Sequence, residues 1–183
     1  MENGLFCWEL AGFIFVIVTG TLLHFVYHWT GHNCIAGLFS PVNESTWEHL
    51  KLLFMPALLY SIVEYFAVGN HFPNFIAAKT LGILFGLLVI VAVFYTYTGI
   101  VGRHFLWADI LTFVLGVAAA FAYSRRTIHL ADAGMIPEFT SLFIVLVLAA
   151  CFVIFTFYPP HIPLFLDPVF HVYGVPDKNL SCR

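Results

Sequence analysis

Five long apolar runs, separated by short polar stretches, are the main pattern along this chain of 183 residues. Each run has about 20 residues, the length that an α-helix needs to cross the hydrocarbon core of a bilayer. The segment after Tyr158 begins with Pro159 and Pro160, which disrupt a helix. The pattern therefore predicts an all-α polytopic transmembrane bundle with a non-helical, Pro/aromatic-rich tail over 159–183. The five helices are predicted over residues 5–28, 45–66, 74–97, 105–123 and 137–157.

Composition supports a single transmembrane domain over residues 1–183. The chain is 61% hydrophobic and only 9% charged, which leaves no room for a separate soluble domain. A net charge of -3 without any Lys/Arg-rich run excludes a nucleic-acid partner, so membrane lipids are the expected partners. Gly82 and Gly86 are four residues apart, a spacing that lets helices approach closely. Such small-residue faces predict tight packing, including a homo-oligomer.

An odd number of spans places the two termini on opposite sides of the membrane. We call the side of the N-terminus side A and the other side B. Basic residues divide almost evenly between the sides, and the adjacent Arg125 and Arg126 favour side A as the cytoplasmic side. Side B receives seven of the nine histidines: His24, His28, His32, His49, His104, His161 and His171.

The densest polar cluster of the chain lies on side B, between the first two spans. Ser45 and Glu48 have the spacing of a capping box, in which both side chains accept backbone N–H groups at a helix start. Glu44 and His49 flank them. Ionisable groups at a membrane boundary are costly unless they have a task, so this cluster is also the first place to look for chemistry.

A metal site is the leading interpretation of the histidines. His24 and His28 lie one helical turn apart on one face, which lets both imidazoles reach one ion. Interfacial hydrogen bonding is the simpler alternative for this pair. With His49 as the third ligand, zinc or another divalent metal would lower the pKa of a bound water to about 7. The residues that we expect to handle protons are Glu44, Glu48, Asp109 and Ser45.

These ingredients resemble the zinc site of the alkaline ceramidase and progestin-receptor-like superfamily of membrane hydrolases. The shared features are the HxxxH pair His24/His28, the SxxxH pair Ser45/His49, and Asp109. In that superfamily the SxxxH pair precedes the aspartate and the HxxxH pair comes last, in seven helices. Here the HxxxH pair comes first and five helices are expected. The resemblance implies zinc-dependent hydrolysis of a lipid-like substrate.

Three further residues on side B are candidates for substrate binding or for a lid. Arg103 would hold an anionic head group, or would simply anchor its helix at the interface. His161 and Asp167 belong to the tail, which we expect to cover the pocket.

Charged residues on side A support an alternative function. Glu9, Glu64 and Lys79 fall at similar depth near the ends of three helices. An ion pair between Glu64 and Lys79 is the simple interpretation. A proton or ion path is the other, which would make the protein a small transporter or channel. A non-catalytic membrane subunit is the third hypothesis.

Three segments, all on side B, resemble a family of small bacterial integral membrane proteins without assigned function. They are SPVNESTWEHLKLLF at residues 40–54, FYTYTG at 94–99 and YPPHIPLFLDP at 158–168. The resemblance implies a multi-pass protein of the bacterial inner membrane and brings no activity with it. The family pattern has small polar residues where this chain has Phe170 and His171, so we do not count His171 as a ligand.

Overall fold

The computed structural model of the protein describes residues 2–129 and 136–176. These residues form six α-helices and two short 3-10 helices, and no β-strand occurs among them. Five of the helices are long and apolar enough to cross a membrane, which confirms the predicted polytopic bundle. The five are α1 (Glu2–Trp29), α3 (Thr46–Ala67), α4 (Phe75–Val101), α5 (Leu106–Thr127) and α6 (Glu138–Phe157).

The structure adds three short elements that the hydropathy pattern did not predict. Helix α2 (Cys34–Phe39) lies in the connection between α1 and α3, and the side-chain oxygen of Asn33 accepts the amide N–H of Ile35 at its start. The 3-10 helix η1 (Gly69–His71) precedes α4, and η2 (Pro163–Phe165) interrupts the otherwise non-helical tail. Each has too few residues for an apolar period to be recognised.

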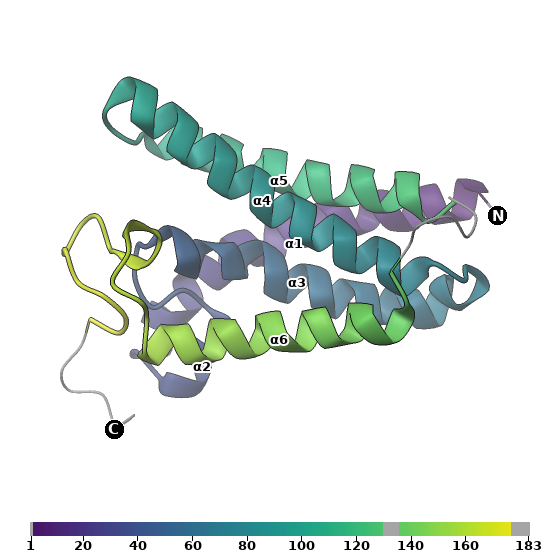
Figure 1. The fold of residues 1–183 in the computed structure, drawn as a ribbon, viewed down its shortest axis with the longest axis horizontal. Coiled ribbons are helices and arrows are strands. Elements are labelled where there is room, and N and C mark those ends of the chain that lie inside the picture. The colour runs from purple at the N-terminus through teal and green to yellow at the C-terminus, as the bar shows by residue number, and fades with distance from the viewer. Residues whose placement is uncertain (1, 130–135, 177–183) are drawn as a thin grey trace.

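The long helices run side by side along the longest axis of the molecule (Figure 1). The start of α1 lies at one end, side A, and the tail that follows α6 lies at the other, side B. At side B, the connection between α4 and α5 stands apart from the ends of α3 and α6. A cavity lined by residues of α3, α4, α5 and the tail lies at this end of the bundle.

Small residues let α4 and α5 approach each other closely. A Cβ atom at Gly86 would lie 2.7 Å from the carbonyl oxygen of Gly116, and one at Gly82 would lie 2.6 Å from that of Ala120. The predicted small-residue packing is therefore used within one chain, and a homo-oligomer stays a prediction.

A second close approach joins α1 to α3. Pro56 has no N–H to donate to the carbonyl of Leu52, one turn earlier in α3. That carbonyl oxygen lies against Gly20 of α1, where any Cβ atom would overlap it. The proline and the glycine therefore belong to one helix contact.

The middle of the bundle is filled by apolar side chains. Val16, Leu53, Phe54, Val117 and Phe152 are fully buried members of one core cluster. The buried charged side chains consequently lie toward the two ends of the bundle.

A buried ion pair organises side B. Lys51 has no exposed surface, and its Nζ lies 2.7 Å from Oε2 of Glu48. The ammonium also donates to Gly37 O at 2.9 Å and to Thr156 Oγ1 at 2.6 Å. One side chain of α3 therefore binds the end of α2 and the end of α6 together.

Glu48 completes this network and only half of the predicted capping box forms. Ser45 Oγ accepts the N–H of Glu48 at 3.4 Å, as a cap should. The Glu48 carboxylate does not return to the start of the helix but accepts the N–H of Val42 at 3.0 Å and the hydroxyl of Thr156 at 2.9 Å. Asn43 Oδ1 accepts the Ser45 N–H in its place.

The tail is fastened to the loop before α3. Asp167 is fully buried, and its carboxylate accepts the backbone N–H groups of Glu44, Val169 and Phe170 at 2.7–3.1 Å. Asn43 Nδ2 donates to the carbonyl of Gly174 at 2.8 Å. The tail thus fixes the loop that carries Glu44.

Removal of either partner of the Glu48–Lys51 pair should destabilise the protein strongly. We expect Glu48→Gln and Lys51→Met each to cost about 3–5 kcal/mol, because each leaves one buried charge without its partner. The double variant should cost less than the sum, because no lone charge remains. Unfolding titrations in detergent micelles measure this, and single variants that cost less than about 1 kcal/mol, as a surface pair would, contradict it.

Candidate metal site

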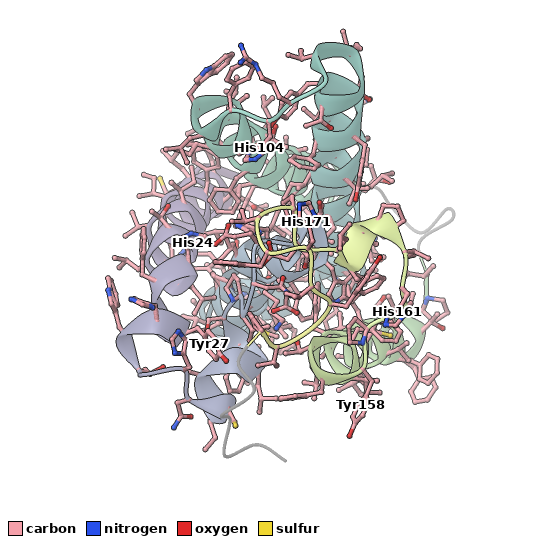
Figure 2. All side chains as sticks on the ribbon, turned by 90° about the vertical axis from the view of Figure 1, so that its left-hand side faces the viewer. His24, Tyr27, His104, Tyr158, His161 and His171 are labelled. Atoms are coloured by element: carbon pink, nitrogen blue, oxygen red, sulfur yellow. The ribbon has the colours of Figure 1, made fainter. Side chains whose placement is uncertain are left out.

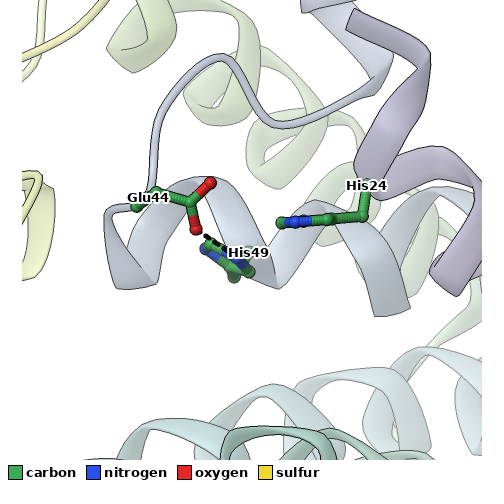
Figure 3. A group of neighbouring side chains, drawn as sticks. All are labelled: His24, Glu44 and His49. Atoms are coloured by element: carbon green, nitrogen blue, oxygen red, sulfur yellow. Dashed lines mark ion pairs between the residues drawn. The ribbon is translucent and has the colours of Figure 1, made fainter. Parts of the chain in front are cut away.

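Three side chains on side B form a group with the composition of a metal site. His24 comes from α1, His49 from the first turns of α3, and Glu44 from the loop that precedes α3. One ligand atom from each lies within 4.8 Å of the other two. Figure 3 shows the His24 ring pointing toward the contact between Glu44 and His49. Two imidazoles and one carboxylate are a ligand set found in catalytic zinc sites, which keep a fourth position open.

The orientation of the His49 ring is fixed by a backbone carbonyl. Its Nδ1 lies 3.0 Å from the carbonyl oxygen of Ser45. Because a carbonyl oxygen only accepts, Nδ1 must carry the hydrogen, and Nε2 is left to face the group. A metal-binding histidine is commonly held in this way by its second nitrogen.

Nε2 of His49 lies 3.4 Å from Oε2 of Glu44. In the neutral ring Nε2 carries a lone pair, and the carboxylate oxygen carries only lone pairs, so the two atoms repel unless a cation lies between them. A proton on Nε2 or a metal ion can supply this charge. The His24 ring, with its centroid 5.2 Å from that of His49, opposes the proton whenever His24 is itself charged.

Zinc ligands about 2.0–2.2 Å from the ion are about 3.4 Å apart in a tetrahedron. Nε2 of His49 and Oε2 of Glu44 already have this separation. The three ligand atoms of the whole group lie within 4.8 Å of one another, which is a looser arrangement. A bound ion would therefore draw His24 closer by about 1 Å.

Two cavities meet at Glu44. The larger, of about 470 Å³, extends from His24 toward His28, His32 and the tail. The smaller, of about 130 Å³, lies between α3 and the α4–α5 pair, and its lining combines polar and apolar side chains. The polar side chains are Glu44, Thr46, His49, His104, Asp109 and Thr112, and the apolar ones are Leu52, Ile90, Phe94, Phe113, Pro168 and Val169.

Asp109 lies on the wall of the smaller cavity that α5 provides. One carboxylate oxygen accepts the hydroxyl of Tyr97, and the other lies 3.1 Å from Nδ1 of His104. The view from side B in Figure 2 places His104 on the α4–α5 connection and His24 across the molecule on α1. The Asp109 carboxylate, held by Tyr97 and His104, therefore lines the same cavity as His49 and Glu44.

The predicted ligand His28 is not part of the group. Its Nδ1 lies 3.4 Å from Nε2 of His32; His28 is exposed and His32 is half-buried. The chain turns after Trp29 and brings His32 back to His28, while His24 lies beside His49 of α3. Glu44, which we expected to take a proton, is the third member of the group.

Other predicted site residues lie elsewhere. Glu48 and Ser45 are buried in the network that supports α3. Asp167 lines the larger cavity, but its carboxylate is engaged by the backbone N–H groups of Glu44, Val169 and Phe170. Arg103 lies on the ring of Phe105, 4.6 Å from its centroid, and is exposed. His161 packs on Tyr173 with ring centroids 4.6 Å apart.

On side A, the three predicted charged residues meet. Lys79 Nζ lies 2.8 Å from Oε1 of Glu9 and 2.6 Å from Oε2 of Glu64. The expected Glu64–Lys79 pair is therefore present, and Glu9 joins it.

The polar networks of side B include three residues that the sequence analysis did not predict: Thr156, Asn43 and Tyr97. An isolated polar residue in or beside an apolar run gives no indication of its partners.

Glu44 should make acid weaken the fold. Without a metal ion, a His49 protonated at Nε2 donates to Glu44 and holds the pKa of Glu44 below its ordinary value of 4.5, so the folded state favours the carboxylate. Its stabilising contribution is present above pH 4.5 and is lost as the pH falls through the lowered pKa. We expect the thermal unfolding midpoint of Glu44→Gln to lie below that of the wild type at pH 7, and the difference to shrink below pH 4.5. Glu138→Gln, which removes an exposed carboxylate on side A, is the control. A difference that grows toward low pH would contradict the interpretation.

Comparison with known proteins gives a family and no function. No curated protein matches the chain, and no solved structure does. The model of a family of unknown function, DUF6512, matches residues 3–175, which include all five spans, the group around His49 and the described part of the tail. The chain therefore belongs to this family of unknown function, DUF6512.

Proposed function

We propose that the protein is a membrane-embedded, metal-dependent hydrolase of a lipid-like substrate. His24, Glu44 and His49 would hold one divalent ion, with zinc as the first candidate. The observation that carries the proposal is the contact between Nε2 of His49 and the Glu44 carboxylate, which needs a positive charge between the two atoms. His24, directed at the same point, supplies a third ligand rather than a counter-charge.

A metal ion in this position would polarise a substrate carbonyl or phosphoryl oxygen and lower the pKa of a bound water. The protein supplies the other requirements. The Ser45 carbonyl orients the His49 ring, and Asp167 holds the backbone N–H of Glu44. Asp109, held by His104, is the proton acceptor on the opposite wall of the cavity.

The lining of the smaller cavity favours an amphipathic substrate. A polar head group would lie between His49 and Asp109, and an acyl chain would extend along Ile90, Phe94 and Phe113. Because the smaller cavity lies between α3 and the α4–α5 pair, a lipid would enter it from the leaflet on side B. Arg103, at the rim, would attract an anionic head group.

We further propose a location in the membrane, a source of substrate and an oligomeric state. The resemblance of the segments at 40–54 and 158–168 supports a bacterial inner membrane as the location. Membrane lipids would be both solvent and substrate source, and a homo-oligomer would use helix faces other than the one that Gly82 and Gly86 occupy.

We rank transport below hydrolysis because the two charged ends are separated. Leu53, Phe54 and Val117 fill the middle of the bundle without exposed surface. A proton or ion path would have to cross this apolar layer.

Metal content of the purified protein tests the site. We expect about one zinc or other divalent ion per chain in the wild type, measured by mass spectrometry after purification without chelator and without a histidine tag. His24→Ala and His49→Ala should each lower the affinity at least about 10-fold, because a lost ligand costs at least as much as a lost supporting group. His28→Ala, which removes a neighbouring histidine outside the group, is the matched control. A metal-free wild type, or equal metal in all four proteins, would leave a protonated His49 as the partner of Glu44 and overturn the proposal.

Asp109→Asn separates chemistry from metal binding. This variant should keep the metal and lower kcat about 10²–10⁴-fold, the usual contribution of a positioned general base. Long-chain fluorogenic esters and amides in mixed micelles are suitable substrates, and His71→Ala on side A is the control. Hydrolysis that survives in Asp109→Asn at the wild-type rate would exclude this aspartate as the base.

A further inference from the structure

The charged group on side A differs from the buried pair on side B in its charge balance. It joins Glu9 of α1, Glu64 of α3 and Lys79 of α4, whose exposed fractions are 4%, 0% and 5%. Two carboxylates therefore share one ammonium, whereas Glu48 and Lys51 on side B are matched one to one. If both carboxylates of the side A group were ionised, one negative charge would remain uncompensated inside the membrane-spanning bundle.

The surrounding groups do not neutralise this charge. Ser124 Oγ donates to Oε1 of Glu9 at 3.2 Å, but a hydroxyl is neutral. The Tyr60 hydroxyl, which is close enough for both carboxylates to act on it, donates to the carbonyl of Trp8 at 2.6 Å instead. Arg125 lies on the ring of Phe6, 4.5 Å from its centroid. Among the described residues, Lys79 is the only basic side chain that forms an ion pair with either carboxylate.

Both carboxylates also have oxygens without a partner. Oε2 of Glu9 and Oε1 of Glu64 are buried and accept no hydrogen bond from any described residue. A buried carboxylate normally accepts several hydrogen bonds, and an ionised one without them is expensive. A neutral carboxyl group in the same place costs far less.

We propose that Glu9 and Glu64 together bind one proton at neutral pH, so that the buried group on side A is electrically neutral. The group is then a proton-binding site, separate from the metal site on side B. A proton is favoured over a metal cation because Lys79 already lies between the carboxylates. In addition, the void beside Lys79 and Ser124 measures about 10 Å³, no more than one water needs. A metal cation would need several oxygen ligands and room for them.

Substitution by glutamine tests the charge balance, because glutamine has the shape of a protonated glutamate. Glu64→Gln should shift the thermal unfolding midpoint at pH 7 by less than about 2 °C, since Glu9 remains to pair with Lys79. Glu48→Gln is the matched control on side B, where Glu48 is the only carboxylate among the described residues that forms an ion pair with Lys51, and it should lower the midpoint by about 6 °C or more. The double variant Glu9→Gln/Glu64→Gln leaves Lys79 alone and should lose as much as the control. If Glu64→Gln were as damaging as Glu48→Gln, both side A carboxylates would be ionised and the proposal would be wrong.

Infrared spectroscopy observes the proton directly. At neutral pH the wild type should show the carbonyl stretch of one protonated carboxyl group, and Asp109→Asn should keep it. Glu9→Gln and Glu64→Gln should each lose it, because the remaining glutamate then ionises to pair with Lys79. A wild type without the band, or a band that survives either substitution, overturns the proposal.

The dependence of the unfolding midpoint on sodium distinguishes a bound proton from a bound sodium ion. At constant ionic strength, exchange of choline chloride for sodium chloride should leave the unfolding midpoint unchanged. A sodium-specific increase that disappears in Glu64→Gln would identify a metal cation at the site and overturn the proton.

Discussion

The constraint on which side B depends is the full burial of the Lys51 ammonium. A charge without exposed surface in a membrane protein must be surrounded by acceptors, and the fold supplies them from α2, α3 and α6. The end of α6, 105 residues away in sequence, therefore has to meet α2 and α3 at one atom. This meeting fixes the loop before α3, and with it the position of Glu44 opposite His49.

The tail provides a second set of hydrogen bonds that hold the loop before α3. Asp167 and Asn43 connect the tail to the same loop through main-chain groups, which tolerate changes of neighbouring side chains. The candidate metal site is thus supported by two buried polar networks that take no part in it. Such support matters because a catalytic group must be held within a fraction of an ångström of its working position.

The two ends of the bundle solve the problem of buried charge differently. On side B a glutamate and a lysine neutralise each other, and His24 and His49 each line a cavity. On side A two glutamates share one lysine, and we propose that a bound proton neutralises the excess negative charge. An apolar core around Phe54 lies between the two ends. The cavity between α3 and the α4–α5 pair is where the proposed amphipathic substrate would lie on side B.

The sequence by itself determined the five spans, their alternation across the membrane and the concentration of histidines on side B, because hydropathy and span length are properties of consecutive residues. It also indicated Ser45 as the cap of α3. Only the tertiary structure decided which polar groups meet. It placed Glu44, rather than His28, beside His24 and His49, and it directed the Glu48 carboxylate to Lys51. These outcomes depend on the rotation of each helix about its axis and on the path of the connecting loops, which packing across the whole bundle sets and which no local pattern contains.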